Sequence, residues 1–386
     1  MRIMFAVTSL GALLLTCAFQ FARKEPNSDS SRQIDLQTLG YNPPRGSDAQ
    51  GNPGFPPKPQ DDFNTRIVFV ASATLAVSFT RLSGATDHNG NFPEAMEVFF
   101  VDTNSSVLIS RKTWPTRPRR WFNDSYDTEG RIIPIEGGFL VHSGDSLYRY
   151  SAGLQEKSKR QLADTSLWAI RVAPLGRRVQ AARINDNDAE VESLDLGTLE
   201  KGHTEHKFPG IVSISDDGAT VRKLAHCLDL QLDGKPERQL CCHDKCSEGM
   251  PTFLDNNDIL SIYGNGFEVL STKGEVLWKR EETVKPYNNT LINDFERSLD
   301  GSRFAIVLIG HQRMFDGTKT PKNYATILVY DSSSRAQVFS TSLKFSDDRH
   351  FGFALSPTGE TLAILSGRTV YVHPLPKVKV TASVKN

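Results

Sequence analysis

Short segments with alternating apolar and polar residues follow one another along most of this chain, and turn residues separate them. The clearest example is Phe351–Leu355, followed by the turn Ser356-Pro-Thr-Gly and by the apolar segments 362–365 and 369–372. Alternation with a period of two is typical of a β-strand, and Pro and Gly suit tight turns. The segment therefore predicts three short antiparallel strands.

The same unit recurs upstream, with its turn glycine at Gly176, Gly218 and Gly301 as well as Gly359. Each second half adds a further strand, turn and strand, which makes four strands in about 40 residues, the pattern of a β-propeller blade. We count seven units from residue 66, of which the second and fourth are weakly marked, so six or eight units are the alternatives. The predicted units are 66–112, 130–163, 166–201, 208–247, 250–283, 291–344 and 350–376.

The turns Ser215-Asp-Asp-Gly, Ser298-Leu-Asp-Gly and Ser356-Pro-Thr-Gly, each before an apolar strand, resemble those of the seven-bladed β-propeller superfamily. That superfamily includes WD-repeat, YVTN and quinoprotein-type domains, and the chain particularly resembles uncharacterised exported bacterial propellers. The resemblance covers about residues 66–376 and implies an all-β fold with a single propeller. The Trp-Asp pair of true WD repeats is absent. Because propellers host many unrelated activities, the resemblance implies no particular function.

The N-terminal region differs in composition from the repeats. Residues 1–18 have the charged start and short apolar stretch of a secretory signal; the alternatives are an anchor retained in a membrane and lipid attachment at Cys17. Residues 19–63 are rich in Pro and Gly and are predicted to be a flexible linker; the alternative is that its short segment Ile34–Gly40 docks on the propeller. The propeller is predicted over 64–377 and a tail over 378–386.

The charge balance excludes some partners. Lys and Arg together number 45, as do Asp and Glu, so the net charge is zero at pH 7. This balance favours neither nucleic acid nor an anionic membrane surface. We expect a monomer that contacts a membrane only if the N-terminal segment anchors it.

The cysteines other than Cys17 form one cluster of four: Cys227, Cys241, Cys242 and Cys246. In an exported chain this even number predicts two disulfides, with three possible pairings. The alternatives are a zinc site with a neighbouring histidine and a strained bond between the adjacent cysteines, as some quinoprotein dehydrogenases have.

No sequence motif indicates catalysis. The G-x-S-x-G, Walker and H-E-x-x-H patterns are absent, and the Asp- and Asn-rich loops lack a full set of calcium ligands. Asp294, Glu296 and Asp300 are too dispersed in sequence to predict a carboxylate pair. We therefore expect no catalytic residue, no metal and no cofactor.

Two long polar connections give the best positional indication of a binding surface. Ser83–Pro93 and His311–Asn323 are both expected between the second and third strands of their blades, and hence on one face of the propeller. His88, His311 and Arg313 are the ligand-face candidates. We also expect a segment near Arg66 to supply the fourth strand that the last unit lacks.

The sequence favours an exported, non-catalytic binding or scaffold module for an unknown protein or small ligand. The alternative is a propeller enzyme, either a quinone-cofactor dehydrogenase or a lactonase-like enzyme. The side chains around the propeller axis discriminate between the two. Converging Asp, Glu or His residues would favour the enzyme, whereas apolar residues would favour the scaffold.

Overall fold

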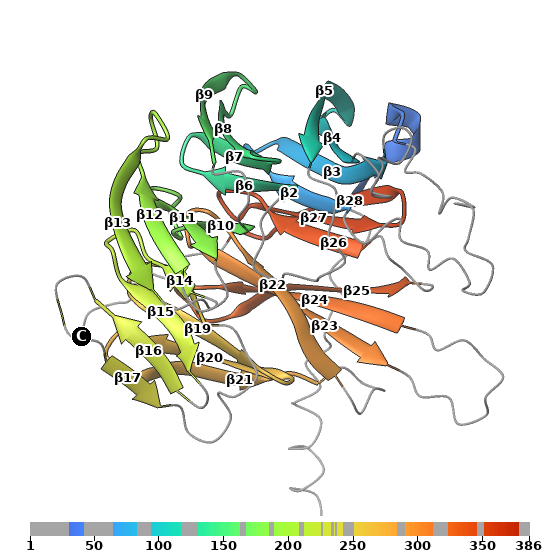
Figure 1. Ribbon diagram of the computed structural model, residues 1–386. Coiled ribbons are helices and arrows are strands. Elements are labelled where there is room, and N and C mark those ends of the chain that lie inside the picture. The colour runs from blue at the N-terminus through green and yellow to red at the C-terminus, as the bar shows by residue number, and fades with distance from the viewer. Residues whose placement is uncertain are drawn as a thin grey trace, which may run out of the picture. The chain divides into compact units, whose positions relative to one another are not determined.

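The chain forms seven antiparallel sheets of four strands each, the blades of a β-propeller (Figure 1). All described residues belong to one compact unit, Ser31–Asn386. The computed structural model describes residues 31–41, 65–82, 94–116, 130–162, 167–184, 189–207, 212–224, 227–232, 235, 238–241, 251–283, 290–311, 323–345 and 351–377.

Each blade places its first strand innermost and its last outermost. The first strands are β2 (Arg66–Phe69), β6 (Arg131–Ile135), β10 (Leu167–Val172), β14 (Val212–Ile214), β18 (Thr252–Phe253), β22 (Thr290–Arg297) and β26 (Phe351–Leu355). The second strands are β3 (Thr74–Leu82), β7 (Gly138–Ser143), β11 (Val179–Ile184), β15 (Thr220–Leu224), β19 (Asp258–Tyr263), β23 (Arg303–His311) and β27 (Thr361–Ser366).

The outer half of each blade is built in the same way. The third strands are β4 (Glu94–Asp102), β8 (Ser146–Ser151), β12 (Ala189–Leu194), β16 (Cys227–Gln231), β20 (Gly266–Ser271), β24 (Asn323–Asp331) and β28 (Thr369–Pro374). The fourth strands are β5 (Val107–Thr116), β9 (Glu156–Gln161), β13 (Lys201–Lys207), β17 (Arg238–Cys241), β21 (Val276–Glu281), β25 (Gln337–Phe345) and, in the last blade, β1 (Arg32–Asp35). Seven blades are thus confirmed, within a few residues of the predicted units.

The repeated turn joins the first and second strands, as the sequence predicts. Its glycines all have positive φ: 70° at Gly176, 103° at Gly218, 71° at Gly301 and 66° at Gly359. In the last three of these turns the preceding serine explains the rest of the motif, because its Oγ accepts a hydrogen bond from a backbone N–H across the turn. For Ser356 the donor is the N–H of Thr361, at 3.0 Å.

The hydrophobic core lies between the blades. One cluster joins β2–β4 to β26–β28, and others join neighbouring blades around the ring. The third blade contributes a further cluster of small side chains: Ala169, Ala182, Ala189 and Val191. Burial on both faces explains why the strand sequences read as nearly continuous apolar runs.

The ring closes through the N-terminal strand, and here one prediction was wrong. β1 pairs antiparallel with β28, while Arg66 begins β2, the innermost strand of the first blade. The short 3₁₀ helix η2 (Leu36–Leu39) follows β1, and Ile34, Leu36 and Tyr41 are buried in the cluster between the first and last blades. Residues 32–41 are therefore part of the propeller and not of a flexible linker.

Both long connections lie where they were expected. Residues 83–93 join the second strand β3 to the third strand β4, and residues 312–322 join β23 to β24. The connections themselves lie outside the described residues. Among the described residues, no helix is both long and apolar enough to cross a membrane; the predicted signal at 1–18 is outside them.

Candidate functional site

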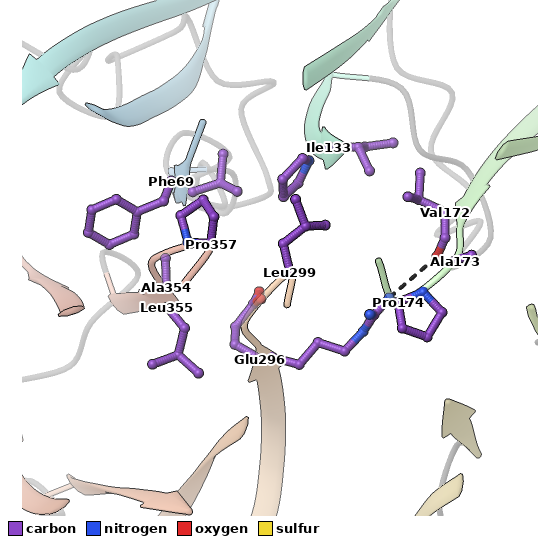
Figure 2. Close-up of a pocket in the computed structure, with 13 residues that line it drawn as sticks. Phe69, Ile133, Val172, Ala173, Pro174, Glu296, Leu299, Ala354, Leu355 and Pro357 are labelled. Atoms are coloured by element: carbon purple, nitrogen blue, oxygen red, sulfur yellow. Dashed lines mark hydrogen bonds between the residues drawn. The ribbon is translucent and has the colours of Figure 1, made fainter. Parts of the chain in front are cut away.

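A cavity lies where the innermost strands of five blades end. Its volume is about 190 Å³, and its lining comes from the ends of β2, β6, β10, β22 and β26 and the turns that follow them. Figure 2 shows Phe69 and Leu355 on one side of this space, Val172 and Pro174 on the other, and Glu296 between them. We call it the axial cavity. Among its lining residues only Glu296 and Arg297 are ionisable.

Arg297 spans the interior of the ring. It is the last residue of β22 in the sixth blade, and its Nη2 donates to the backbone carbonyl of Val172 in the third blade, at 3.4 Å (Figure 2, dashed line). Its Nη1 is buried and makes no hydrogen bond with the described residues. Burial lowers the pKa of Arg297 to about 10, opposed by the charges of Asp216 and Glu296. The guanidinium is thus still charged at neutral pH.

Glu296 is the second ionisable group of the axial cavity. Burial and then the charge of Asp294 raise its pKa to about 8, while Arg297 and Arg66 act in the opposite direction. Part of the side chain is open to the cavity, but protein surrounds the remainder, so desolvation of the carboxylate dominates. At neutral pH Glu296 is therefore mostly protonated and can donate a hydrogen bond.

Asp294 lies two residues before Glu296 on the same strand. β22 has a bulge between Ile292 and Asp294, and a bulge changes which face the following residues take. Asp294 is exposed to solvent at the inner strand, but the protein around it still desolvates its carboxylate and raises its pKa, whereas the hydrogen bond from the N–H of Phe295 to Oδ1 and the charges of Arg66 and Arg131 lower it. The structure thus brings together two acids that the sequence analysis had judged too dispersed to pair.

Arg66 lowers the pKa of both acids and Arg131 that of Asp294, and Arg171 is a further arginine on an innermost strand. Arg66 and Arg131 are the first residues of β2 and β6, and Arg171 is the penultimate residue of β10. Burial lowers the pKa of Arg171 to about 10. The residues around the axis are therefore neither purely apolar nor a set of converging acids and histidines.

Hydrogen bonds between successive turns connect neighbouring blades, beginning with the turn that follows the lining residue Pro174. The carboxylate of Asp216 accepts from the backbone N–H groups of Leu175 at 2.8 Å and Arg177 at 3.0 Å, and its own N–H donates to Asn256 Oδ1 at 2.9 Å. Asp216 thus links the turns of the third, fourth and fifth blades. Gly176 must be glycine here, since a Cβ would lie 2.5 Å from the backbone nitrogen of Glu136.

A similar bond connects the last two blades. The N–H of Asp300 donates to the carbonyl of Pro357 at 3.0 Å. Pro357, Pro134 and Pro174 all line the axial cavity, and none of them has an N–H. The rim is therefore cross-linked and poor in hydrogen-bond donors, which leaves Arg297 as the main source of them.

The residues singled out from the sequence lie elsewhere or outside the described part. Cys227 on β16 is opposite Cys241 on β17 in the strand register, and Cys242 and Cys246 fall outside the described residues, so the disulfide pairing stays a prediction. His88 and Arg313 fall outside as well, and only the backbone of His311 is described, at the end of β23.

Metal binding was not expected. Within the described ranges, no group of three or more His, Cys, Asp or Glu side chains has an arrangement that would hold a metal ion.

Comparisons with known proteins show no family for this chain. No protein-family model and no curated protein matches the chain. Hsv2p of Kluyveromyces lactis is 14% identical over 81% of this chain and 98% of its own, with a TM-score of 0.43. A chain of the mitotic checkpoint complex is 11% identical over 82% of this chain and 92% of its own, with a TM-score of 0.46.

A protein of unknown function from Bacteroides caccae is also similar, at 11% identity over 71% of this chain and 94% of its own, with a TM-score of 0.40. No function transfers at this level of similarity. The resemblance to exported bacterial propellers in particular stays a prediction.

The sequence alone did not predict that the residues of the axial cavity form a site, and the reason lies in the fold. Innermost strands are expected to be apolar, so Asp294, Glu296 and Arg297 on one such strand are the anomaly that could have marked the site. Their convergence with Val172 depends on the closed ring, because these segments are far apart in sequence.

Proposed function

We propose that this protein is a binding module that holds a small ligand in the axial cavity. The observation that carries the proposal is a cavity walled by five blades, apolar over most of its lining, with two ionisable side chains from one strand. Binding sites for small molecules commonly combine an apolar concave surface with a few placed polar groups.

The turn network supports the same proposal. Asp216 holds the turn that contains the lining residue Pro174, and the bond from Asp300 holds the turn that contains the lining residue Pro357. A rim held in place before binding lowers the entropy cost of ordering the site when a ligand arrives.

The test is a ligand-observed NMR screen of a fragment library against the wild type and Leu299→Trp. Leu299 lies in a turn at the cavity, so an indole there should block access. Val276→Trp is the matched control, because Val276 is 51% exposed on the outer strand β21. We expect fragments that bind wild type and Val276→Trp but not Leu299→Trp. Equal binding to all three proteins would contradict the proposal.

A second candidate is an enzyme, and one observation favours it. Asp294 and Glu296 both have raised pKa values beside the axial cavity, and perturbed carboxylates are common in catalytic sites. The same NMR samples discriminate between the two candidates. A binding module leaves each fragment chemically unchanged after prolonged incubation, whereas an enzyme converts one of them and loses this activity in Glu296→Gln.

We also propose that the protein is exported and acts as a monomer, with residues 1–18 as its signal and the four clustered cysteines in two disulfides. The apolar N-terminal stretch and the even number of cysteines support this proposal. Cell fractionation tests the location. Mass spectrometry before and after reduction should give a gain of about 4 Da, the mass of four hydrogens, if two disulfides are present. An unchanged mass would contradict the disulfides.

A further inference from the structure

The guanidinium of Arg297 makes fewer hydrogen bonds than a buried cation usually does. A guanidinium has five N–H donors, yet Arg297 makes one long bond through Nη2, and its buried Nη1 has no partner among the described residues. An unsatisfied buried donor on a charged group is costly, so such a group indicates a site for an acceptor.

The acids near Arg297 do not satisfy it. Asp216 acts on it through its charge, but each carboxylate oxygen of Asp216 already accepts a backbone N–H, from Leu175 and Arg177. Glu296 is mostly protonated at neutral pH because of burial and the nearby charge of Asp294, with Arg66 and Arg297 opposing. The cavity therefore offers a cation and an O–H donor, and both suit the oxygens of one carboxylate.

The remaining lining determines the rest of the ligand. It is aliphatic or aromatic, with Val172, Leu355 and Phe69 among its members. A volume of about 190 Å³ corresponds to about six groups the size of a water molecule. A phosphate fits less well, because a dianion would face a single guanidinium and an apolar wall. A short branched acid fits the size, the charge and the apolar surface.

We propose that the axial cavity binds a short branched aliphatic carboxylate, whether a free acid or the C-terminal residue of a peptide, with its oxygens on Arg297 and Glu296. This inference rests on the proposed function, because it requires that the axial cavity be the binding site. The aliphatic part contacts the apolar lining, and the carboxylate replaces the weak bond from Arg297 to Val172.

The experiment is calorimetric titration of the full chain at pH 7 with 3-methylbutanoate and, as a neutral match, 3-methylbutanamide. A tripeptide ending in leucine, with a free or an amidated C-terminus, distinguishes a peptide from a free acid. We expect the acid to bind at least about tenfold more tightly than the amide. Arg297→Met should remove this preference, whereas Arg177→Met, at an exposed ion pair with Glu136 on the same rim, should leave it unchanged.

Glu296→Gln supplies an independent readout. The amide keeps a donor but cannot ionise, so binding to Glu296→Gln should be constant from pH 7 to pH 9. Wild-type binding should weaken about tenfold over the same range as Glu296 loses its proton. If Arg297→Met does not fold, Arg297→Lys and the comparison of acid with amide still test the inference.

The outcomes separate this inference from the proposed function. Equal binding of acid and amide, abolished by Leu299→Trp, would overturn the carboxylate and leave the binding module intact. Binding of the acid to Arg297→Met as tightly as to wild type would also overturn it. If Leu299→Trp weakens the binding of neither these probes nor any fragment, both proposals fail.

Discussion

Ile34 pairs with Val370, so the N-terminal strand β1 completes the last blade of the ring. Ile34 is 2% exposed, and its neighbours in the same cluster come from the first blade as well as the last. The short segment that contains β1 therefore connects the first blade to the last.

Removing the apolar contacts of this segment should open the ring. Tyr41 is fully buried, its ring packs edge-on against Phe79 at 4.9 Å, and its hydroxyl is 3.0 Å from Thr65 Oγ1. We expect Tyr41→Ala to lower the free energy of unfolding by about 3–5 kcal/mol, since it removes a large buried side chain. Denaturant unfolding measures this loss. Gln33→Ala, at an exposed position on β1, is the control, and equal stability of the two variants would contradict closure of the ring by residues 32–41.

The blades could be predicted from the sequence, whereas the closing strand could not. The turns that contain Gly218, Gly301 and Gly359 each carry a local signal, a serine that accepts a backbone N–H and a glycine with positive φ. β1 has only four residues, with exposed neighbours on both sides of Ile34. Its stability comes from pairing with β28, a strand far away in sequence, so the local pattern indicates only that the segment could dock and not where.

Asp216 should stabilise the rim of the axial cavity more than any surface ion pair does. It accepts two backbone N–H groups from the preceding blade, and hydrogen bonds to a charged group contribute about 1.5–3 kcal/mol. We expect Asp216→Ala to destabilise the protein by about 2 kcal/mol or more. Glu136→Ala, which removes an exposed pair with Arg177, should cost less than about 1 kcal/mol. Urea denaturation compares them, and the reverse order would contradict the role of Asp216.

The contribution of the turn serines to the stability of the fold should also be measurable. Ser356 is 1% exposed and accepts the N–H of Thr361. Ser356→Ala leaves that donor buried without its acceptor, so we expect a loss of about 1–3 kcal/mol. Thr358→Ala, at an exposed position of the same turn, should change stability little. Thermal unfolding of the two variants checks this, and a similar melting temperature for both would show that the serine is dispensable.

Glu296 should make stability depend on pH. Folding raises the pKa of this acid from 4.5 to about 8, so the folded state holds the proton more tightly than the unfolded state. Stability should therefore fall as pH rises from about 4.5 to about 8, by an amount on the order of a few kcal/mol. In Glu296→Gln this loss is absent. Its stability relative to wild type should rise steadily between pH 5 and pH 8.

The control for this pH effect is Glu200→Gln, which changes an exposed glutamate. Urea denaturation at pH 5, 6.5 and 8 gives the three free energies for each protein. A constant difference between wild type and Glu296→Gln across this range would mean that Glu296 is not held protonated.

The axial cavity could be predicted only in part. An ionisable cluster on an innermost strand is visible in the sequence at Asp294, Glu296 and Arg297. The partner of Arg297 is not, because Val172 lies three blades away and contributes a backbone carbonyl, which any residue has. The bulge in β22 that sets the orientation of Asp294 has no distinct sequence pattern either.

The most direct test is a crystal structure of the protein with 3-methylbutanoate. The account predicts the ligand in the axial cavity, with its carboxylate about 3 Å from the Arg297 guanidinium and from Glu296, and with its methyl groups against the apolar lining. An acid bound elsewhere, with Arg297 still on the carbonyl of Val172, would contradict it.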